Sequence, residues 1–429
     1  MAKPQPQGLG PRAAAAHMLA EVLRNGDGLE DAFERCCREG RLVDEAPRER
    51  ALARAILTTA LRRKGHLDEL LKKYITKPLP LSAGFTLEII MIAAAQILFM
   101  RVPPHAASSL AVETALGDQK ARHFTGLINA VLRRLADDAP AILAVKPKPG
   151  INAPRWLFAR WQRHYGTPVA RELALAHLEE APLDLTVKAD PDVWAKELGA
   201  EKLQGGTLRL QQSEGRIDEL AGYAQGAWWV QDQAASLPAK LLGDVAGLRV
   251  LDLCAAPGGK TAQLAAAGAH VTALDISARR LDRLKANLQR LDLHAEIVNA
   301  DGLAYKADEP FDAILLDAPC SATGTLRRHP DIAWHRSEAQ IRELVQLQRA
   351  MQRHAASLLK PGGKLVFSTC SLEPDEGEEH LKFTPEGLRL DPIAITELPT
   401  PQIWKEPGIL RSLPQFGMDG FFAARYVRV

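Results

Sequence analysis

Hydrophobic residues in the first third of the chain recur with the period of a helix. Between residues 11 and 136, Leu, Ile, Val and Ala return at spacings of three and four, as they do on the buried faces of helices. The pair Pro103 and Pro104 should end one helix and open the next. The predicted helices cover residues 13–24, 49–63, 67–74, 86–100, 106–116 and 121–135.

From residue 248 onward, short β-type runs alternate with helical stretches. This alternation is typical of a doubly wound α/β sheet with parallel strands. Residues 421–429 can add a last strand at the edge of that sheet. The predicted strands cover residues 248–253, 271–274, 295–298, 313–316 and 364–367, with helices at 261–267, 278–291 and 339–359 between them.

The region between these two patterns divides into a linker and a small α/β module. Residues 140–154 contain four prolines and no helical period, which favours a stiff linker. Residues 155–235 mix helical and β-type stretches, as a small RNA-binding module would. The predicted organisation is therefore a helical domain at 1–139, a linker at 140–154, the module at 155–235 and the sheet domain at 236–429.

Charge, cysteine content and hydropathy indicate which partners, cross-links and membrane segments to expect. The net charge of the 429 residues is only +2, but residues 1–150 hold 22 Lys and Arg against 16 Asp and Glu, which gives +6 and hints at a polyanionic partner. Five cysteines without a Cys-x-x-Cys pair argue against a disulfide framework or a zinc site. The most apolar run, residues 89–100, is about half the length that a bilayer requires. We expect a cytoplasmic, monomeric protein without metal or membrane.

The stretch from Leu248 to Thr261 carries the first candidate site. Asp252 lies near the carboxyl end of its strand, where open α/β sheets bind ligands. Pro257, Gly258 and Gly259 then turn the chain into a helix whose amino end favours a carboxylate or phosphate. An ordinary strand–helix turn would look similar, so this stretch alone does not decide between the two interpretations.

Further acids and cysteines follow the later strands and favour a ligand site. Asp275 ends the second strand, 23 residues after Asp252, at the position where an acid accepts hydrogen bonds from a ribose. Asp301 ends the third strand. Asp317 and Cys320 follow the fourth, and Cys370 follows the fifth. The chain lacks the Gly-x-Gly-x-x-Gly pattern of nicotinamide enzymes.

Three stretches resemble the motifs of the RsmB/NOP family of S-adenosylmethionine-dependent RNA cytosine-5 methyltransferases: residues 252–260 (DLCAAPGGK), 317–324 (DAPCSATG) and 369–374 (TCSLEP). Residues 102–106 (VPPHA) and 124–132 (FTGLINAVL) resemble the all-α NusB-like RNA-binding domain. Together these motifs are similar to the members of the family that modify bacterial 16S ribosomal RNA. The implied fold is a NusB-like helical domain, a small α/β module and a Rossmann-like class I methyltransferase sheet.

The resemblance also implies roles for individual residues. It makes Cys370 the nucleophile, assigns Cys320 to product release and places Asp317 at both the substrate and the cofactor. The residues implied to surround S-adenosylmethionine are Cys254, Ala255, Ala256, Pro257, Gly258, Gly259, Lys260, Asp275, Asp301 and Asp317.

Two cysteines fit the chemistry of cytosine methylation. Carbon 5 of cytosine accepts a methyl group only after a thiolate has added to carbon 6. Loss of the carbon-5 proton then expels the thiol. DNA enzymes use the Pro-Cys cysteine, whereas the RNA family uses the Thr-Cys cysteine. The presence of Pro319-Cys320 and Thr369-Cys370 together favours RNA.

The basic segment after the Pro-Cys motif is the candidate RNA contact. By resemblance, Arg327, Arg328 and His329 border the substrate and could hold backbone phosphates. A solvated basic loop is the alternative. The helix expected after Glu379 is shortened by the early arrival of Pro385, which puts the packing behind Cys370 in question.

The motifs leave the target open. The main hypothesis is methylation of carbon 5 of one cytosine in 16S ribosomal RNA. The same chemistry on tRNA or another RNA is one alternative, because catalytic motifs do not encode the target. A non-catalytic RNA-binding assembly factor is the other, although such a protein would need neither thiol.

Overall fold

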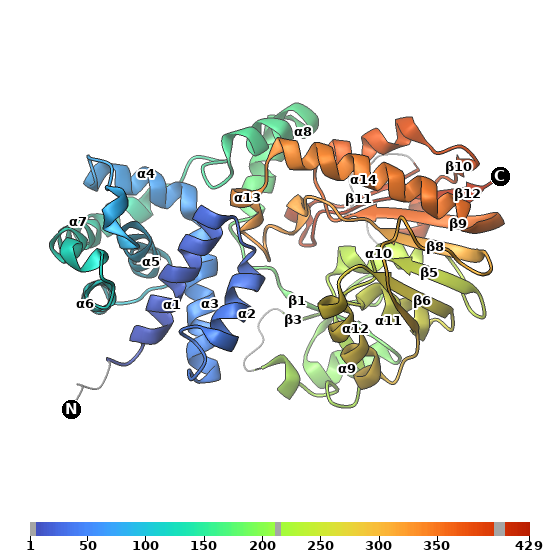
Figure 1. Cartoon of the computed structure of the whole chain (residues 1–429), viewed down its shortest axis with the longest axis horizontal. Coiled ribbons are helices and arrows are strands. Elements are labelled where there is room, and N and C mark those ends of the chain that lie inside the picture. The colour runs from blue at the N-terminus through green and yellow to red at the C-terminus, as the bar shows by residue number, and fades with distance from the viewer. Residues whose placement is uncertain (1–5, 211–215, 399–407) are drawn as a thin grey trace. The chain divides into compact units, whose positions relative to one another are not determined.

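The computed structural model describes residues 6–210, 216–398 and 408–429 (Figure 1). Contacts within the chain divide it into two units. Unit 1 comprises residues 1–179 and 326–336, and unit 2 comprises residues 180–325 and 337–429. No helix in the described ranges combines the length and the apolar character needed to cross a membrane.

Unit 1 is all-α, as predicted. Its helix α5 is buried along almost its whole length, from Ile89 to Leu98, and five of the other helices pack around it. This explains why the most apolar run of the chain is a core helix. The helices are α1 (Leu9–Ala20), α2 (Leu29–Glu39), α3 (Pro47–Arg62), α4 (Lys64–Tyr74), α5 (Thr86–Phe99), α6 (Pro104–Leu116), α7 (Thr125–Ala144), α8 (Arg155–Ala176) and α13 (Ile332–His335).

Two predicted boundaries differ in the structure. The proposed linker at 140–154 is shorter than predicted, because α7 continues through an exposed Pro140 to Ala144. The rest of that stretch is held by the helical unit, where Asn152 Oδ1 accepts a hydrogen bond from the backbone N–H of His66 at 2.9 Å. Helix α8 also belongs to unit 1 and not to the α/β module. Long-range packing of its buried face, which includes Trp161 and Leu173, decides this assignment.

A short segment from the second half of the chain completes unit 1. Asp331 accepts a hydrogen bond from the backbone N–H of Leu29 at 3.0 Å, and the Trp334 indole donates to the carbonyl of Leu61 at 2.9 Å. Leu326 is buried in the same unit, with 3% of its surface exposed. Residues 326–336 are therefore part of the helical domain, although they follow the Pro-Cys motif directly in sequence.

Unit 2 begins with a four-stranded antiparallel sheet of order β2-β3-β1-β4. The paired tryptophans Trp228 and Trp229 form part of β4 and are buried, with 0% and 4% exposure. Among the described residues, one short α-helix and a 3-10 turn at Ile217–Glu219 connect its strands. Its elements are β1 (Leu183–Val187), α9 (Pro191–Leu198), β2 (Glu201–Lys202), β3 (Leu208–Leu210) and β4 (Trp228–Val230).

The larger sheet of unit 2 has the order β10-β12-β9-β8-β5-β6-β7, with β11 paired to β12. Strands β5 to β9 are parallel, as the alternation predicts. The elements are α10 (Gln233–Lys240), β5 (Arg249–Leu253), α11 (Gly259–Ala266), β6 (His270–Asp275), α12 (Ala278–Leu291), β7 (Glu296–Asn299), β8 (Phe311–Asp317), α14 (Glu338–Ser357), β9 (Leu359–Thr369), β10 (Leu388–Leu390), β11 (Leu410–Arg411) and β12 (Phe422–Arg428).

Apolar cores cover both faces of this sheet. Helices α10, α11 and α12 pack on one face, and α14 packs on the other (Figure 1). Strand β12 is antiparallel to both β9 and β10, so it lies inside the sheet and not at its edge as predicted. Because β5, β8 and β9 are parallel neighbours, their carboxyl ends lie at the same rim of the sheet, and this rim carries the candidate site.

Candidate active site

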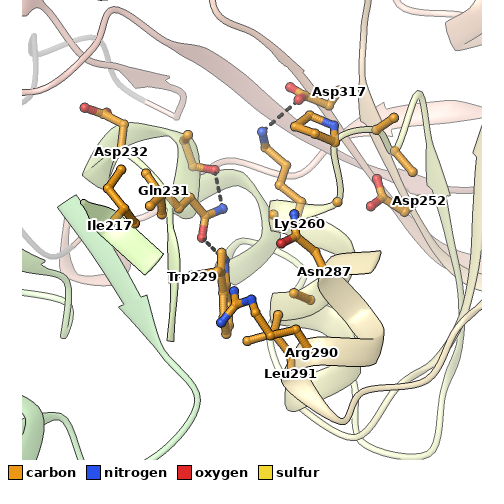
Figure 2. A pocket seen from close by; sticks show the side chains of 18 of the residues that line it. Ile217, Trp229, Gln231, Asp232, Asp252, Lys260, Asn287, Arg290, Leu291 and Asp317 are labelled. Carbon is orange, nitrogen blue, oxygen red and sulfur yellow. Dashed lines mark hydrogen bonds and ion pairs between the residues drawn. The ribbon is translucent and has the colours of Figure 1, made fainter. Parts of the chain in front are cut away.

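A pocket of ≈ 600 Å³ opens at the carboxyl ends of β5 and β8 (Figure 2). One wall is the predicted motif from Cys254 to Lys260, with Asp252 and Asp317 beside it. The opposite wall comes from the antiparallel sheet and from α12. Its residues include Tyr223, Trp229, Gln231, Asn287 and Arg290.

The turn at the start of α11 depends on glycine. Gly258 has φ +102°, and a Cβ at this position would lie 2.7 Å from Leu284 Cγ. Only glycine meets both requirements without strain. Helix α11 begins at Gly259, so its first backbone N–H groups point toward the pocket without intrahelical partners. The sequence therefore builds a polar cradle from backbone atoms at this wall.

Asp252 is the most desolvated acid of the pocket. Its side chain is fully buried, Oδ2 accepts a hydrogen bond from Thr261 Oγ1 at 2.6 Å, and Oδ1 has no protein partner. Burial raises the pKa of Asp252 to about 7. A buried acceptor without a partner is costly unless a ligand donates to it, so Asp252 is a strong candidate for a contact with a cationic or N–H-bearing ligand.

Lys260 and Asp317 form an ion pair inside the pocket. Their Nζ and Oδ2 atoms lie 2.7 Å apart (Figure 2). Ser368 Oγ donates to the other carboxylate oxygen at 2.9 Å. Burial lowers the pKa of Lys260, but Asp317 and Asp252 outweigh this effect, and the net pKa is raised. Lys260 therefore stays charged and holds Asp317 in one orientation.

Asp275 and Asp301 end adjacent strands but do not line this pocket. Asp275 is 1% exposed and accepts hydrogen bonds from the backbone N–H groups of Ala256 and Ser277, at 3.2 and 2.9 Å. Its carboxylate also pairs with Arg280. Asp301 is exposed and accepts from the N–H of Leu303 in its own turn at 2.9 Å. Direct contact of either acid with a cofactor stays a prediction.

The two predicted cysteines meet at the rim formed by β8 and β9. Their sulfur atoms are 3.4 Å apart, within hydrogen-bond distance for thiols. The hydrogen bond with Cys370, together with burial, raises the pKa of Cys320 well above its ordinary value. Cys320 therefore keeps its proton and can donate it toward the sulfur of Cys370. Cys254, in contrast, is a half-buried thiol whose pKa is raised by desolvation.

The basic segment lies in unit 1. Arg327 is 5% exposed, and its carbonyl accepts a hydrogen bond from Arg62 at 2.9 Å. His329 lies 3.9 Å from Glu30, and burial lowers the pKa of its imidazole. Arg328 is half-buried. Arg328 and His329 are therefore more exposed than Arg327, and contact of any of the three with RNA stays a prediction.

The pocket contains residues that sequence reasoning did not assign to it. Asp252 was recognisable as a strand-end acid, but its orphaned oxygen depends on burial. Trp229 is held by a hydrogen bond from its indole to Gln231 Oε1 at 3.0 Å (Figure 2). Asn287 and Arg290 come from α12, where nothing in the helical pattern distinguishes them from ordinary surface residues.

Comparison with known proteins agrees with this arrangement. Residues 239–427 match the family of 16S rRNA methyltransferases RsmB/F, and residues 10–137 match the NusB family. Two relatives called ribosomal RNA small subunit methyltransferase B, from Cronobacter sakazakii and Klebsiella pneumoniae, are each 34% identical over 97% of this chain and 98% of their own length. The chain belongs to the RsmB/F methyltransferase family.

Solved structures agree with this assignment at the level of the fold. The structure of PH0851 covers 99% of both chains with a TM-score of 0.74 at 23% identity. A methyltransferase homologue from Pyrococcus horikoshii, 27% identical, covers 64% of this chain and 95% of its own with a TM-score of 0.56. The NusB-like helical domain and the class I methyltransferase sheet are thus both features of known proteins.

The cofactor of this RsmB/F-family chain is S-adenosylmethionine, and the pocket suits it. The cofactor carries a cationic sulfonium, an ammonium and a carboxylate. Asp252 offers an unpartnered buried oxygen to a cation or an N–H group. The amino end of α11 offers backbone N–H groups to a carboxylate. The motif from Cys254 to Lys260 is therefore the part of the chain that would hold it.

Proposed function

We propose that this chain methylates carbon 5 of one cytosine in 16S ribosomal RNA through a covalent bond between Cys370 and the base. S-adenosylmethionine supplies the methyl group when bound. The proposal rests above all on the contact between Cys320 and Cys370, because two thiols at 3.4 Å can address two adjacent atoms of one pyrimidine ring. The 16S RNA target is supported by the description of the RsmB/F family and by the small-subunit ribosomal RNA in the names of the relatives.

Cys320 is the thiol that keeps its proton. The hydrogen bond with Cys370 and burial raise the pKa of Cys320, so it can offer its proton to the sulfur of Cys370, the nucleophile of this proposal. After Cys370 Sγ has bonded to carbon 6, Cys320 Sγ lies beside the adduct, at the stage when a base must take the proton from carbon 5 and the bond to Cys370 must break.

Asp317 has the position to hold the base during these steps. Lys260 occupies one of its oxygens and Ser368 the other, and each oxygen keeps a free lone pair. An orientated carboxylate at this place accepts a hydrogen bond from the exocyclic amine or from a protonated ring nitrogen of cytosine. This interaction would stabilise the adduct.

Bisulfite sequencing tests the proposal, since a carbon-5 methyl group protects cytosine from conversion. In a strain that lacks the gene, we expect one cytosine of 16S RNA to lose protection, and the wild-type gene to restore it. A Cys370→Ala gene should not. Protection lost only in tRNA would move the activity to another substrate. Unchanged protection in all RNA would leave a non-catalytic assembly factor.

A further inference from the structure

Four residues flank the two cysteines, and all four are hydrogen-bonded to one buried pair, Glu376 and Gln348. On the Cys320 side, Gln348 Nε2 donates to the carbonyl of Pro319 at 2.8 Å, and the backbone N–H of Ser321 donates to Glu376 Oε1 at 2.8 Å. The Ser321 hydroxyl donates to the same carboxylate.

The Cys370 side is held by the same pair. The Ser371 hydroxyl donates to Glu376 Oε2 at 2.6 Å, and Thr369 Oγ1 donates to the backbone carbonyl of Glu376 at 2.9 Å. Gln348 Nε2 also donates to Glu376 Oε1 at 3.0 Å and so closes the pair. The residues before and after each cysteine are therefore all hydrogen-bonded to Glu376 or to Gln348.

The pair formed by Glu376 and Gln348 is buried and has further hydrogen-bond partners. Glu376 and Gln348 both have 0% exposure, and His380 contacts the Gln348 amide oxygen at 3.0 Å. In a desolvated site each of these hydrogen bonds is stronger than in water, and leaving any of the groups unpaired is costly. The loops of the two cysteines are consequently held by one buried pair, in addition to direct contacts between them such as the one between the Ser321 and Ser371 hydroxyls at 3.1 Å.

We infer that Glu376 and Gln348 are positioning residues that set the distance between the Cys320 and Cys370 sulfurs. The inference rests on the proposed function for its purpose, since a nucleophile and a proton acceptor must reach adjacent ring atoms. Its geometry is independent of the substrate. Neither side chain is placed to contact the base, so both act through the cysteines that they hold.

Disulfide formation measures the sulfur spacing without RNA or cofactor. Hydrogen peroxide oxidises the two thiols to one disulfide: each sulfur gives up its proton and one electron, the S–S bond forms, and the peroxide is reduced to two molecules of water. One thiol first becomes a sulfenic acid, and the second then displaces water from it. At a peroxide concentration high enough that more peroxide no longer raises the rate, the rate at which peptide mapping detects the Cys320–Cys370 cross-link in the full chain reports how often the sulfurs meet.

We expect Glu376→Ala to lower this rate at least tenfold, and Glu376→Gln to recover most of it, because a glutamine oxygen can still accept from the N–H of Ser321. Gln348→Met keeps the side-chain volume and removes the tie to Pro319, and should also slow the reaction. Gln352→Met is the matched control. It lies one turn further along α14, is equally buried and leaves the ties in place.

Methyl transfer gives the second readout. The kcat should fall in Glu376→Ala with the KM for S-adenosylmethionine unchanged. Cross-linking at the wild-type rate in a folded Glu376→Ala protein would overturn the inference, and so would equal slowing in Gln352→Met. If Glu376→Ala does not fold, Glu376→Gln and Gln348→Met carry the test. If the wild-type chain did not methylate RNA, the proposed function would be wrong, but the cross-linking rates would still test the positioning role of Glu376 and Gln348.

Discussion

The sulfur atoms of Cys320 and Cys370 lie 3.4 Å apart, although the two cysteines are 50 positions apart in sequence. Strand pairing causes this approach. Strands β8 and β9 are neighbouring and parallel, and Asp317 is paired with Ser368 at their ends. The three residues after Asp317 and the two after Ser368 therefore leave the sheet at the same rim, where each strand delivers one thiol.

The first prediction separates the roles of these thiols. Cys370→Ala should bind RNA and S-adenosylmethionine but form neither adduct nor product. Cys320→Ala should attack the base, accept the methyl group and then stall as a covalent protein–RNA complex. A denaturing gel detects that complex, and the double variant should lack it. Accumulation of the complex in Cys370→Ala instead would assign the nucleophile to Cys320.

The second prediction concerns Asp275. Replacing it by Ala removes the acceptor for the backbone of Ala256 and Ser277, and with it any contact to a ribose. Affinity for S-adenosylmethionine should fall by about 1.5–3 kcal/mol. Calorimetry measures this, with the exposed Asp282→Ala on α12 as the control. Equal affinities in the two variants would remove Asp275 from the site.

The third prediction concerns the pH dependence of stability. The pKa of Asp252 is about 7 in the folded chain, because of burial, and about 3.9 in an unfolded chain. The folded state thus binds this proton more tightly. The stability that results is fully present below about pH 4 and is lost as pH rises to about 7, with a slope of up to about 1.4 kcal/mol per pH unit.

Asp252→Asn should remove that slope. Urea unfolding of the cofactor-free protein at pH 5, 6, 7 and 8 should show a steeper loss of stability in the wild type than in the variant. Above pH 7 the two curves should run parallel. If the variant followed the wild-type curve across the whole range, the acid would not be protonated in the folded state.

The fourth prediction concerns Gly324, which lies between the cysteine loops. Its N–H donates to the carbonyl of Cys370 at 3.0 Å, and a Cβ at this position would lie 1.9 Å from the carbonyl oxygen of Gly420. Backbone would have to move, so Gly324→Ala should cost about 1–3 kcal/mol of stability and lower kcat.

Gly126→Ala is the matched control, because a methyl group at this position on α7 would meet no other atom within 4 Å. This change should be neutral or stabilise by up to about 1 kcal/mol. Urea midpoints and initial rates measure both variants. A Gly324→Ala protein with the stability and the rate of the Gly126→Ala protein would show that the cysteine loops tolerate displacement.

Much of the fold was predictable from local pattern. The helical period of residues 13–135 and the alternation after residue 248 report which faces are buried, and burial is what forms these elements. The predicted linker at 140–154 is too long because its four prolines and the lack of a helical period favour a linker, whereas an exposed proline near the end of α7 is tolerated. The interior place of β12 depends on pairing with β9 and β10, which no local pattern encodes.

In the candidate site, the motif residues were predictable from the sequence and the residues that support them were not. The motif residues Asp317, Cys320 and Cys370 come together because strand ends of one parallel sheet share a rim. The supporting residues were not predictable, since Glu376 and Gln348 look like surface residues of a charged segment and of a helix. Their burial is a long-range property. The segment after Glu379 forms a short 3-10 helix, Glu378–Phe383, whose buried His380 contacts Gln348.

The docking of residues 326–336 into unit 1 means that the polypeptide passes between the two units three times. Removal of residues 1–179 alone would therefore leave one part of the helical domain, residues 326–336, inserted in the chain of unit 2. A chain that started after Glu179 would leave Leu326 and Ile332 without their apolar surroundings, six or more residues from Cys320. Activity lost in such a truncated enzyme would reflect a disturbed loop after Cys320 as well as missing RNA contacts.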